Sequence, residues 1–175
     1  RCQRDQRLRE GDVLQLYIND EFFDKPSEEN MFLTLFKPRL TVVYEDEHIL
    51  LADKPQGLVV HADETEKVNT LINHIQAYLY QKREWNPRWE NAFTPALCNR
   101  IDRNTGGIVI AAKDAETLRI LNEKIRGREL DKRYLCVTVG RPKQPEGRVE
   151  CFLLKDEQKK QVSVYHRPVP GGKTA

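Results

Sequence analysis

The sequence predicts an α+β protein with a mixed, largely antiparallel sheet and packed helices. Short apolar runs rich in β-branched side chains recur between polar turns, which is the pattern of strands. Two longer segments repeat apolar residues every three or four positions, as amphipathic helices do. No internal repeat or low-complexity tract is visible, and the sum of these elements is an α+β arrangement.

The first predicted elements are a hairpin and a helix. Leu40–Tyr44 and His48–Lys54 are two apolar runs joined by acidic residues, which predicts a β-hairpin. Pro55 ends the second strand, because proline cannot donate a hydrogen bond to a β-ladder. Apolar residues at helical spacing predict a helix over Asn69–Lys82, and Pro87 forbids its continuation beyond that point.

A loop, a strand and a second helix follow. Trp85–Pro95 is predicted to be a loop, and the β-branched run Ile108–Ala112 to be a buried strand. Asp114 can cap a helix over Ala115–Arg126, which Gly127 ends. The predicted buried stripe of this helix comprises Leu118, Leu121 and Ile125.

The last part of the chain is predicted to hold three more strands, at Tyr134–Gly140, Arg148–Leu154 and Gln161–His166. We expect the first of these to join the hairpin and the buried strand in one sheet, with both helices packed against it. Cys136 and Cys151 lie in these apolar runs and are predicted to be small core residues.

The composition allows a folded domain and leaves its partner open. A chain of 175 residues with 39% hydrophobic content can bury a core, which argues against wholesale disorder. A net charge of +2 does not by itself indicate a protein that binds nucleic acid. RNA binding would therefore depend on a local basic surface. Candidate basic residues lie near the start of the chain and from the last turn of the second helix onward: Arg1, Arg4, Arg7, Arg9, Lys124, Arg126, Arg128, Lys132 and Arg133.

The cysteines and the hydropathy pattern indicate in which cell compartment the protein is expected. The four cysteines are scattered without a Cys-x-x-Cys pair, which argues against a zinc site and suits a reducing cytosol. No apolar run reaches the length of a membrane span, and no signal peptide is visible. We therefore expect a cytoplasmic protein with no membrane partner, although the chain starts at Arg1 rather than at a methionine.

The most informative segment places an acid between two arginines, just before the predicted strand. Asp102 stands between Arg100 and Arg103, and two glycines at positions 106 and 107 allow a tight turn or a close approach to a ligand. The arginines should keep the acid ionised, and they could also bind phosphates. Two interpretations stay open on this segment alone: a solvated surface turn, or a poised acid on a loop anchored to a strand.

Three motifs, met in order along the chain, resemble the RluA family of pseudouridine synthases. They are the segments 42–61, which contains Lys-Pro-x-Gly, 99–113 around the acid, and 131–142. The resemblance covers the chain from about Leu40 to its last residue. The family pattern around the acid reads His-Arg-Leu-Asp and then Thr-Ser-Gly; here Asn99 replaces the histidine, Ile101 the leucine and Gly106 the serine.

The resemblance implies an RNA-modifying isomerase of bacterial type, expected to be a monomer, that needs no metal and no organic cofactor. It would convert uridine to pseudouridine in structured RNA, ribosomal more readily than transfer RNA. Asp102 would be the catalytic acid, either adding to the sugar carbon or removing a ribose proton, in a pocket closed to bulk water. Tyr134 would stack on the target base, and Arg100 would fill the gap that the flipped nucleotide leaves. Further RNA-binding residues are expected to be Arg103, Lys54, His61, Lys132 and Arg133.

The resemblance also suggests how the chain is organised. Residues 1–23 resemble the closing segment of a small α-L RNA-binding domain, 24–38 form a linker, and 39–175 form the catalytic domain without its C-terminal part. A family motif with a further arginine, expected to pair with the acid, is not present. The chain is therefore expected to be truncated at both ends.

Two other functions stay possible from the sequence. One is a non-catalytic RNA-binding module derived from this family, which the departures at Asn99 and Gly106 support. The other is a carboxylate-dependent hydrolase, which needs a second acid with a raised pKa. Asp53, Asp63 and Glu64 are available for that role, but their spacing singles none of them out.

Overall fold

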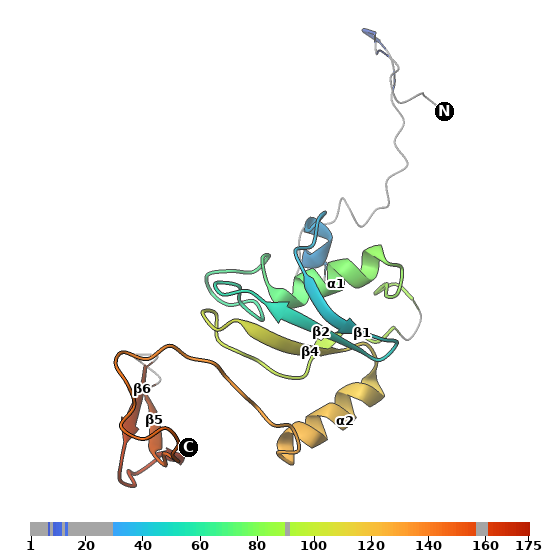
Figure 1. The fold of residues 1–175 in the computed structure, drawn as a ribbon. Coiled ribbons are helices and arrows are strands. Elements are labelled where there is room, and N and C mark those ends of the chain that lie inside the picture. Colours follow the sequence, from blue (N-terminus) through green and yellow to red (C-terminus); the bar gives the residue numbers. More distant parts are fainter. Residues whose placement is uncertain (1–6, 8, 12, 14–29, 90–91, 157–160) are drawn as a thin grey trace. The chain divides into compact units, whose positions relative to one another are not determined.

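The computed structural model describes residues 7, 9–11, 13, 30–89, 92–156 and 161–175 (Figure 1). The chain divides into two compact units, residues 1–131 and 132–175. Most of the segment 1–23, and the first part of the expected linker, lie outside the described residues. In the described part of the chain, no helix has both the length and the apolar composition that crossing a membrane requires.

A four-stranded antiparallel sheet organises the first unit. Its strand order is β1 (Thr41–Glu45), β2 (Ile49–Lys54), β4 (Gly107–Ala112) and β3 (Ala96–Leu97). The hairpin and the buried strand predicted from the sequence are confirmed, with ends that move by one residue. β2 and β4 pair along their whole length, from Ile49 opposite Ala112 to Lys54 opposite Gly107.

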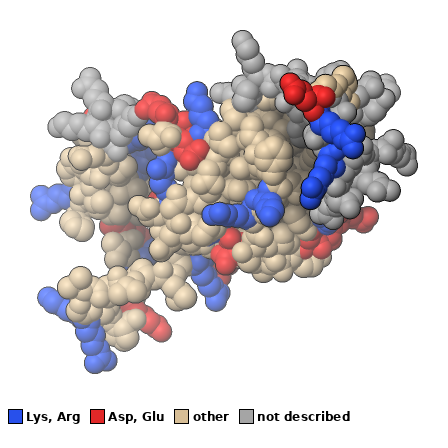
Figure 2. Space-filling model, turned by 90° about the horizontal axis from the view of Figure 1, so that it is seen from above, with Lys and Arg blue, Asp and Glu red and all other residues tan. Residues whose placement is uncertain are grey.

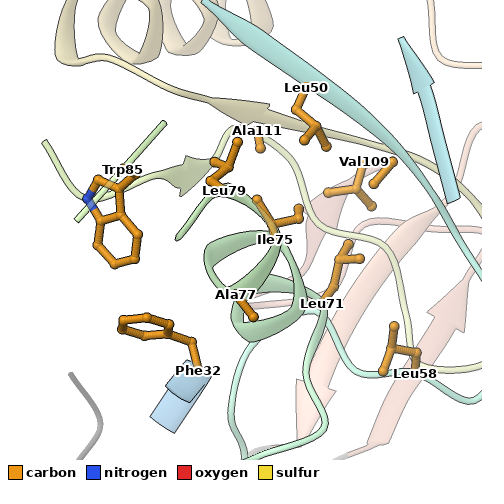
Figure 3. Close-up of a cluster of buried hydrophobic side chains, with 11 residues drawn as sticks. Phe32, Leu50, Leu58, Leu71, Ile75, Ala77, Leu79, Trp85, Val109 and Ala111 are labelled. Carbon is orange, nitrogen blue, oxygen red and sulfur yellow. The ribbon is translucent and has the colours of Figure 1, made fainter. Parts of the chain in front are cut away.

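Helix α1 (Leu71–Gln81) covers one face of this sheet, as predicted. The Thr70 hydroxyl accepts a hydrogen bond from the Asn73 N–H and so caps the helix. The apolar side chains of α1 meet those of β2 and β4 in the core that Figure 3 displays. The most deeply buried members of this contact are Leu50, Leu71, Ile75, Leu79, Val109 and Ala111.

Part of the interval expected to be a linker belongs to this core. The short 3₁₀-helix η2 (Met31–Thr34) buries Phe32, whose ring centre lies 5.0 Å from that of Trp85 and 5.6 Å from that of Tyr80. Figure 3 shows the Phe32 and Trp85 rings side by side. Burying two large aromatic rings favours a fixed attachment over a free connection. Within 24–38, the segment around Phe32 is therefore packed rather than free.

Helix α2 (Ala115–Arg126) has the predicted bounds. The Asp114 carboxylate accepts a hydrogen bond from the Thr117 N–H at 2.7 Å, and Gly127 is the C-cap. The residue with left-handed backbone is the next one, Arg128, at φ 58°. Leu118, Leu121 and Ile125, the predicted buried stripe, are less exposed than most of the helix but only half-buried. No α2 side chain is fully buried.

The second unit contains a separate three-stranded antiparallel sheet, ordered β6 (Gln161–Tyr165), β5 (Phe152–Asp156) and β7 (Lys173–Thr174). The strand predicted at Gln161–His166 is confirmed, whereas the one predicted at Arg148–Leu154 begins only at Phe152.

The predicted strand Tyr134–Gly140 is not formed. The segment has no regular structure, and Leu135, Val137 and Val139 are fully exposed. Cys136, expected in the core, is exposed, and Cys151 is half-buried. The apolar alternation is typical of a strand, but a strand also needs a neighbour to pair its backbone groups. The expectation that this segment joins the sheet of β1, β2 and β4 is therefore wrong for this structure.

Candidate functional site

The loop that carries Asp102 connects β3 to β4. Asp102 is exposed, and its carbonyl oxygen accepts a hydrogen bond from the Thr105 N–H at 3.1 Å, which closes a turn. Gly107 then opens β4 with φ at 131°, a backbone conformation that favours glycine. The acid thus lies on an exposed turn of the first unit that leads directly into β4.

Lys54 anchors this loop from inside the protein. Its side chain is fully buried, and its ammonium donates to the carbonyl oxygens of Leu58 at 2.7 Å, Pro55 at 3.0 Å and Arg103 at 3.0 Å. The Gly57 N–H also donates to the Arg103 carbonyl, at 2.8 Å. The Lys-Pro-x-Gly turn is therefore bonded to the residue that follows Asp102.

This geometry corrects the RNA-binding role expected for Lys54. A lysine has three N–H donors, and here all three are used by carbonyl oxygens, so none is available to a phosphate. Burial lowers the pKa of Lys54, and the negative charge of Asp102 opposes that shift. The ammonium therefore lies close enough to the acid for their charges to interact.

Arg103 pairs with a carboxylate from another loop. Its Nη2 donates to Asp63 Oδ2 at 3.0 Å and to Thr65 Oγ1 at 2.7 Å. Asp63 Oδ1 in turn accepts hydrogen bonds from the hydroxyl and N–H of Thr65 and from the N–H of Glu66. The guanidinium expected to bind RNA thus ties the 63–66 loop to the Asp102 loop.

The surroundings of Asp63 also bear on the hydrolase alternative. Hydrogen bonds from Thr65 and Glu66, with Arg103 beside them, hold the pKa of Asp63 far below its usual range. A general acid in glycoside hydrolysis needs the opposite shift. Of the three acids considered, Asp63 is therefore unsuited to that role.

His61 and Arg100 lie close together at the surface. Partial desolvation of its ring lowers the pKa of His61, and the positive charge of Arg100 lowers it further. Both residues are exposed, which suits the RNA contacts expected of them. Figure 2 shows Lys and Arg side chains mixed with acidic ones on the face that it displays, in agreement with the small net charge.

The other expected site residues belong to the second unit. Tyr134 is 65% exposed, and Lys132 and Arg133 are exposed as well. The structure brings Lys54, Arg103 and Asp102 together in the first unit, whereas Tyr134 belongs to the second, so its pairing with Asp102 stays a prediction.

Two signals for this site are visible in the sequence only in retrospect. Residues 50, 52 and 54 lie on one face of β2 because side chains alternate along a strand, so Lys54 shares the buried face of Leu50 and Ala52. Gly106 has room for the serine of the family pattern, since an added Cβ would meet the Lys54 carbonyl at 3.4 Å and Gln56 Cγ at 3.6 Å. That departure is therefore compatible with the family geometry.

Comparison with known proteins gives a consistent result. The family model described as RNA pseudouridylate synthase matches residues 48–175. An uncharacterized RNA pseudouridine synthase of Mycoplasma genitalium is 30% identical over 95% of this chain and 51% of its own length. The ribosomal large subunit pseudouridine synthase D of Borreliella burgdorferi is 28% identical over 85% of this chain and 46% of its own length. The chain thus spans about half the length of these relatives.

One solved structure shares the fold. The human RNA pseudouridylate synthase domain containing 4 matches with a TM-score of 0.57 and 19% sequence identity, over 84% of this chain and 54% of that chain. At that level of identity the match bears on the fold, and it confirms the α+β class predicted from the sequence.

Proposed function

We propose that this chain, which belongs to the RNA pseudouridylate synthase family, forms part of an enzyme that converts uridine to pseudouridine in RNA. One observation carries the proposal: an exposed carboxylate, Asp102, stands on a loop whose backbone is bonded to a buried lysine. A loop held in this way restricts where its acid can lie, and the position of a reacting group is a large part of catalysis.

The chemistry assigned to Asp102 involves the bond between N1 of uracil and the ribose. In one route its carboxylate adds to the sugar carbon and displaces uracil, so that the bond to N1 breaks. In the other route it removes a ribose proton as that bond breaks, which leaves a glycal. The base turns and its C5 joins the same sugar carbon, which releases the carboxylate in the first route and takes the ribose proton back in the second. C5 then loses its proton and N1 gains one.

The substrate has to leave its stack to reach this acid. Extruding a base costs a few kcal/mol, which contacts with the protein must offset. We assign part of that compensation to Arg100 in the vacated space and part to stacking on Tyr134, which is worth ~1–3 kcal/mol per base. His61, Lys132 and Arg133 would contact the surrounding RNA.

We further propose ribosomal RNA as the substrate and the cytoplasm as the location. The first is supported by relatives named ribosomal large subunit pseudouridine synthase D, including that of Pseudomonas aeruginosa, which is 36% identical over 58% of this chain. The second is supported by four cysteines that are scattered along the sequence.

The test replaces Asp102 by asparagine in the whole protein. Asp102→Asn keeps the size of the side chain but removes its charge, so pseudouridine formation in ribosomal RNA should fall by several orders of magnitude. RNA affinity and melting temperature should stay near those of the wild type. Asp53→Asn is the matched control, because Asp53 is an exposed carboxylate on β2 next to Lys54, and it should leave activity unchanged.

Two outcomes would contradict the proposal. Activity of Asp102→Asn within about tenfold of wild type, which is ~1.4 kcal/mol of barrier, would show that the carboxylate does not perform the chemistry. A wild-type protein that binds RNA without modifying it would instead support the non-catalytic RNA-binding module.

A further inference from the structure

Asn99 lies where the main chain leaves the sheet on its way to Asp102. β3 pairs with β4 through Ala96 opposite Ala112 and Leu97 opposite Ala111. The Cys98 N–H continues this pairing with a 2.8 Å hydrogen bond to the Ile110 carbonyl. Beyond Cys98 the backbone turns away, so the next polar groups of β4 would lose their partners on this side.

The side chain of Asn99 takes over at that point. Its Oδ1 accepts a hydrogen bond from the Ile110 N–H at 2.8 Å, and its Nδ2 donates to the Ile108 carbonyl at 3.3 Å. One carboxamide thus serves a donor and an acceptor of β4, as a further strand residue would. Asparagine can do this because it carries both kinds of group on a short stem.

Neither aspartate nor alanine at position 99 could bond both the Ile110 N–H and the Ile108 carbonyl. Aspartate keeps the acceptor but has no N–H for the Ile108 carbonyl, and alanine offers neither. The bond to the Ile110 N–H is partly buried, and an unpaired N–H away from water is costly, whereas the bond to the Ile108 carbonyl is exposed and contributes less. The bond to Ile110 therefore does most to attach the loop to β4.

We propose that Asn99 is a positioning residue for Asp102. It lets the backbone leave the sheet three residues before the acid while the edge of β4 stays paired, and Lys54 fixes the carbonyl of Arg103 on the other side. The acid therefore stands between two attachments, one to β4 and one to the buried lysine. This inference rests on the proposed function, because it assigns Asn99 a role in the same reaction.

The test compares Asn99→Ala and Asn99→Asp with the wild type, using kcat and KM for ribosomal RNA together with hydrogen exchange of the Ile110 amide. A displacement of about 1 Å at a reacting group can cost 10²-fold in rate. We therefore expect kcat to fall about 10-fold to 100-fold in both variants, with KM within about twofold of wild type. Exchange at Ile110 should accelerate in Asn99→Ala and change less in Asn99→Asp, which keeps the acceptor.

The control removes a similar side-chain hydrogen bond from the opposite end of β4. Asp114→Ala deletes the cap of α2 and should lower the melting temperature at least as much as Asn99→Ala does, with kcat unchanged. An equal fall of kcat in Asp114→Ala would reduce the Asn99 effect to general destabilisation and overturn the inference.

Other results separate the inference from the proposed function. Unchanged exchange at Ile110 in Asn99→Ala, or faster exchange with unchanged kcat, would overturn the positioning role while the function stands. A wild-type protein that forms no pseudouridine would overturn the function, and the positioning role with it.

Discussion

The two ends of β4 are held in different ways. At the Gly107 end, the side chains of Asn99 and Lys54 bond to backbone groups, and the loop they fix carries an exposed acid. At the Ala112 end, Lys113 bonds to the carboxylates of Glu45 and Glu84, and to the Asp46 carbonyl. One end fixes the path of a loop, whereas the other neutralises a cluster of acidic side chains.

The two ends differ in how many polar groups would lose their partner if one lysine were removed. Lys54 serves three carbonyl oxygens that no other described side chain replaces, since the backbone N–H of Gly57 reaches only that of Arg103. The Lys113 cluster is redundant: Lys82 also pairs with Glu45 and Glu84, and the Tyr78 hydroxyl donates to Glu45 at 2.9 Å. The end near Asp102 should therefore be the more sensitive to substitution.

The largest expected effect is at Lys54. Lys54→Met keeps the length of the buried side chain but leaves buried carbonyls without a donor, each worth about 1–3 kcal/mol, so unfolding should become easier by about 3 kcal/mol. Chemical denaturation measures this. Lys82→Met, which removes a more exposed lysine from the opposite end, should cost under about 1 kcal/mol. Equal losses would erase the difference between the two ends.

Lys113 should give the next largest effect. Its side chain is 12% exposed, and Lys113→Met removes three bonds while Lys82 continues to neutralise both acids. We expect a loss of about 1–2 kcal/mol, between the costs for Lys54 and Lys82. A loss as large as that of Lys54→Met would show that the cluster is not redundant.

The pH dependence of the same variant sharpens this prediction. Burial would raise the pKa of Glu84, but hydrogen bonds from Lys113 and Lys82 lower it to about 2. A lowered pKa contributes stability above the unfolded value of 4.5, and this is lost as pH falls toward 2. Lys113→Met should therefore weaken the loss of stability between pH 4.5 and 2, because Glu84 then titrates closer to its unfolded value.

The same two ends show what the sequence can predict. The bounds of α2, with Asp114 as its cap, follow from local signals, as do the strands on either side of the hairpin turn. The burial of Lys54 is also readable from strand alternation. The partnership of Arg103 with Asp63, 40 residues away, is not, because nothing local says which loops meet. The segment from Tyr134 fails for the same reason: its alternation is local, but strand pairing is not.

The ion pair of Arg103 and Asp63 should have a smaller effect, on rate rather than on folding. Both side chains are 45% exposed, and solvent weakens such pairs. Asp63→Asn and Arg103→Met should each lower kcat about twofold to fivefold, and the double variant should be no worse than either single one. Glu116→Gln on α2 controls for the change of charge.

Salt titration of RNA binding then distinguishes the two roles considered for Arg103. If the only role of this guanidinium is to hold Asp63 and Thr65, Arg103→Met should leave the salt dependence as in the wild type. A slope lowered by about 0.7–0.9 would instead show a phosphate contact, and would restore the RNA-binding role first expected from the sequence.

The smallest expected effect is at His48, on the surface at the Ala112 end of β4. Its Nδ1 lies 3.0 Å from Asp114 Oδ2, and this hydrogen bond, opposed by partial burial and aided by nearby Glu47, raises the pKa of His48. A folded-state pKa above the unfolded value contributes stability that is fully present below about pH 6.5 and is lost as pH rises through the folded value. His48→Gln should therefore lower the melting temperature slightly at pH 5.5 and not at pH 9.

Because the contact lies at the opposite end of β4 from Asp102, kcat of this variant at pH 7.5 should be unchanged. A fall in kcat without a change in melting temperature would mean that the two ends of β4 are coupled, and that the charged end also helps to place the acid.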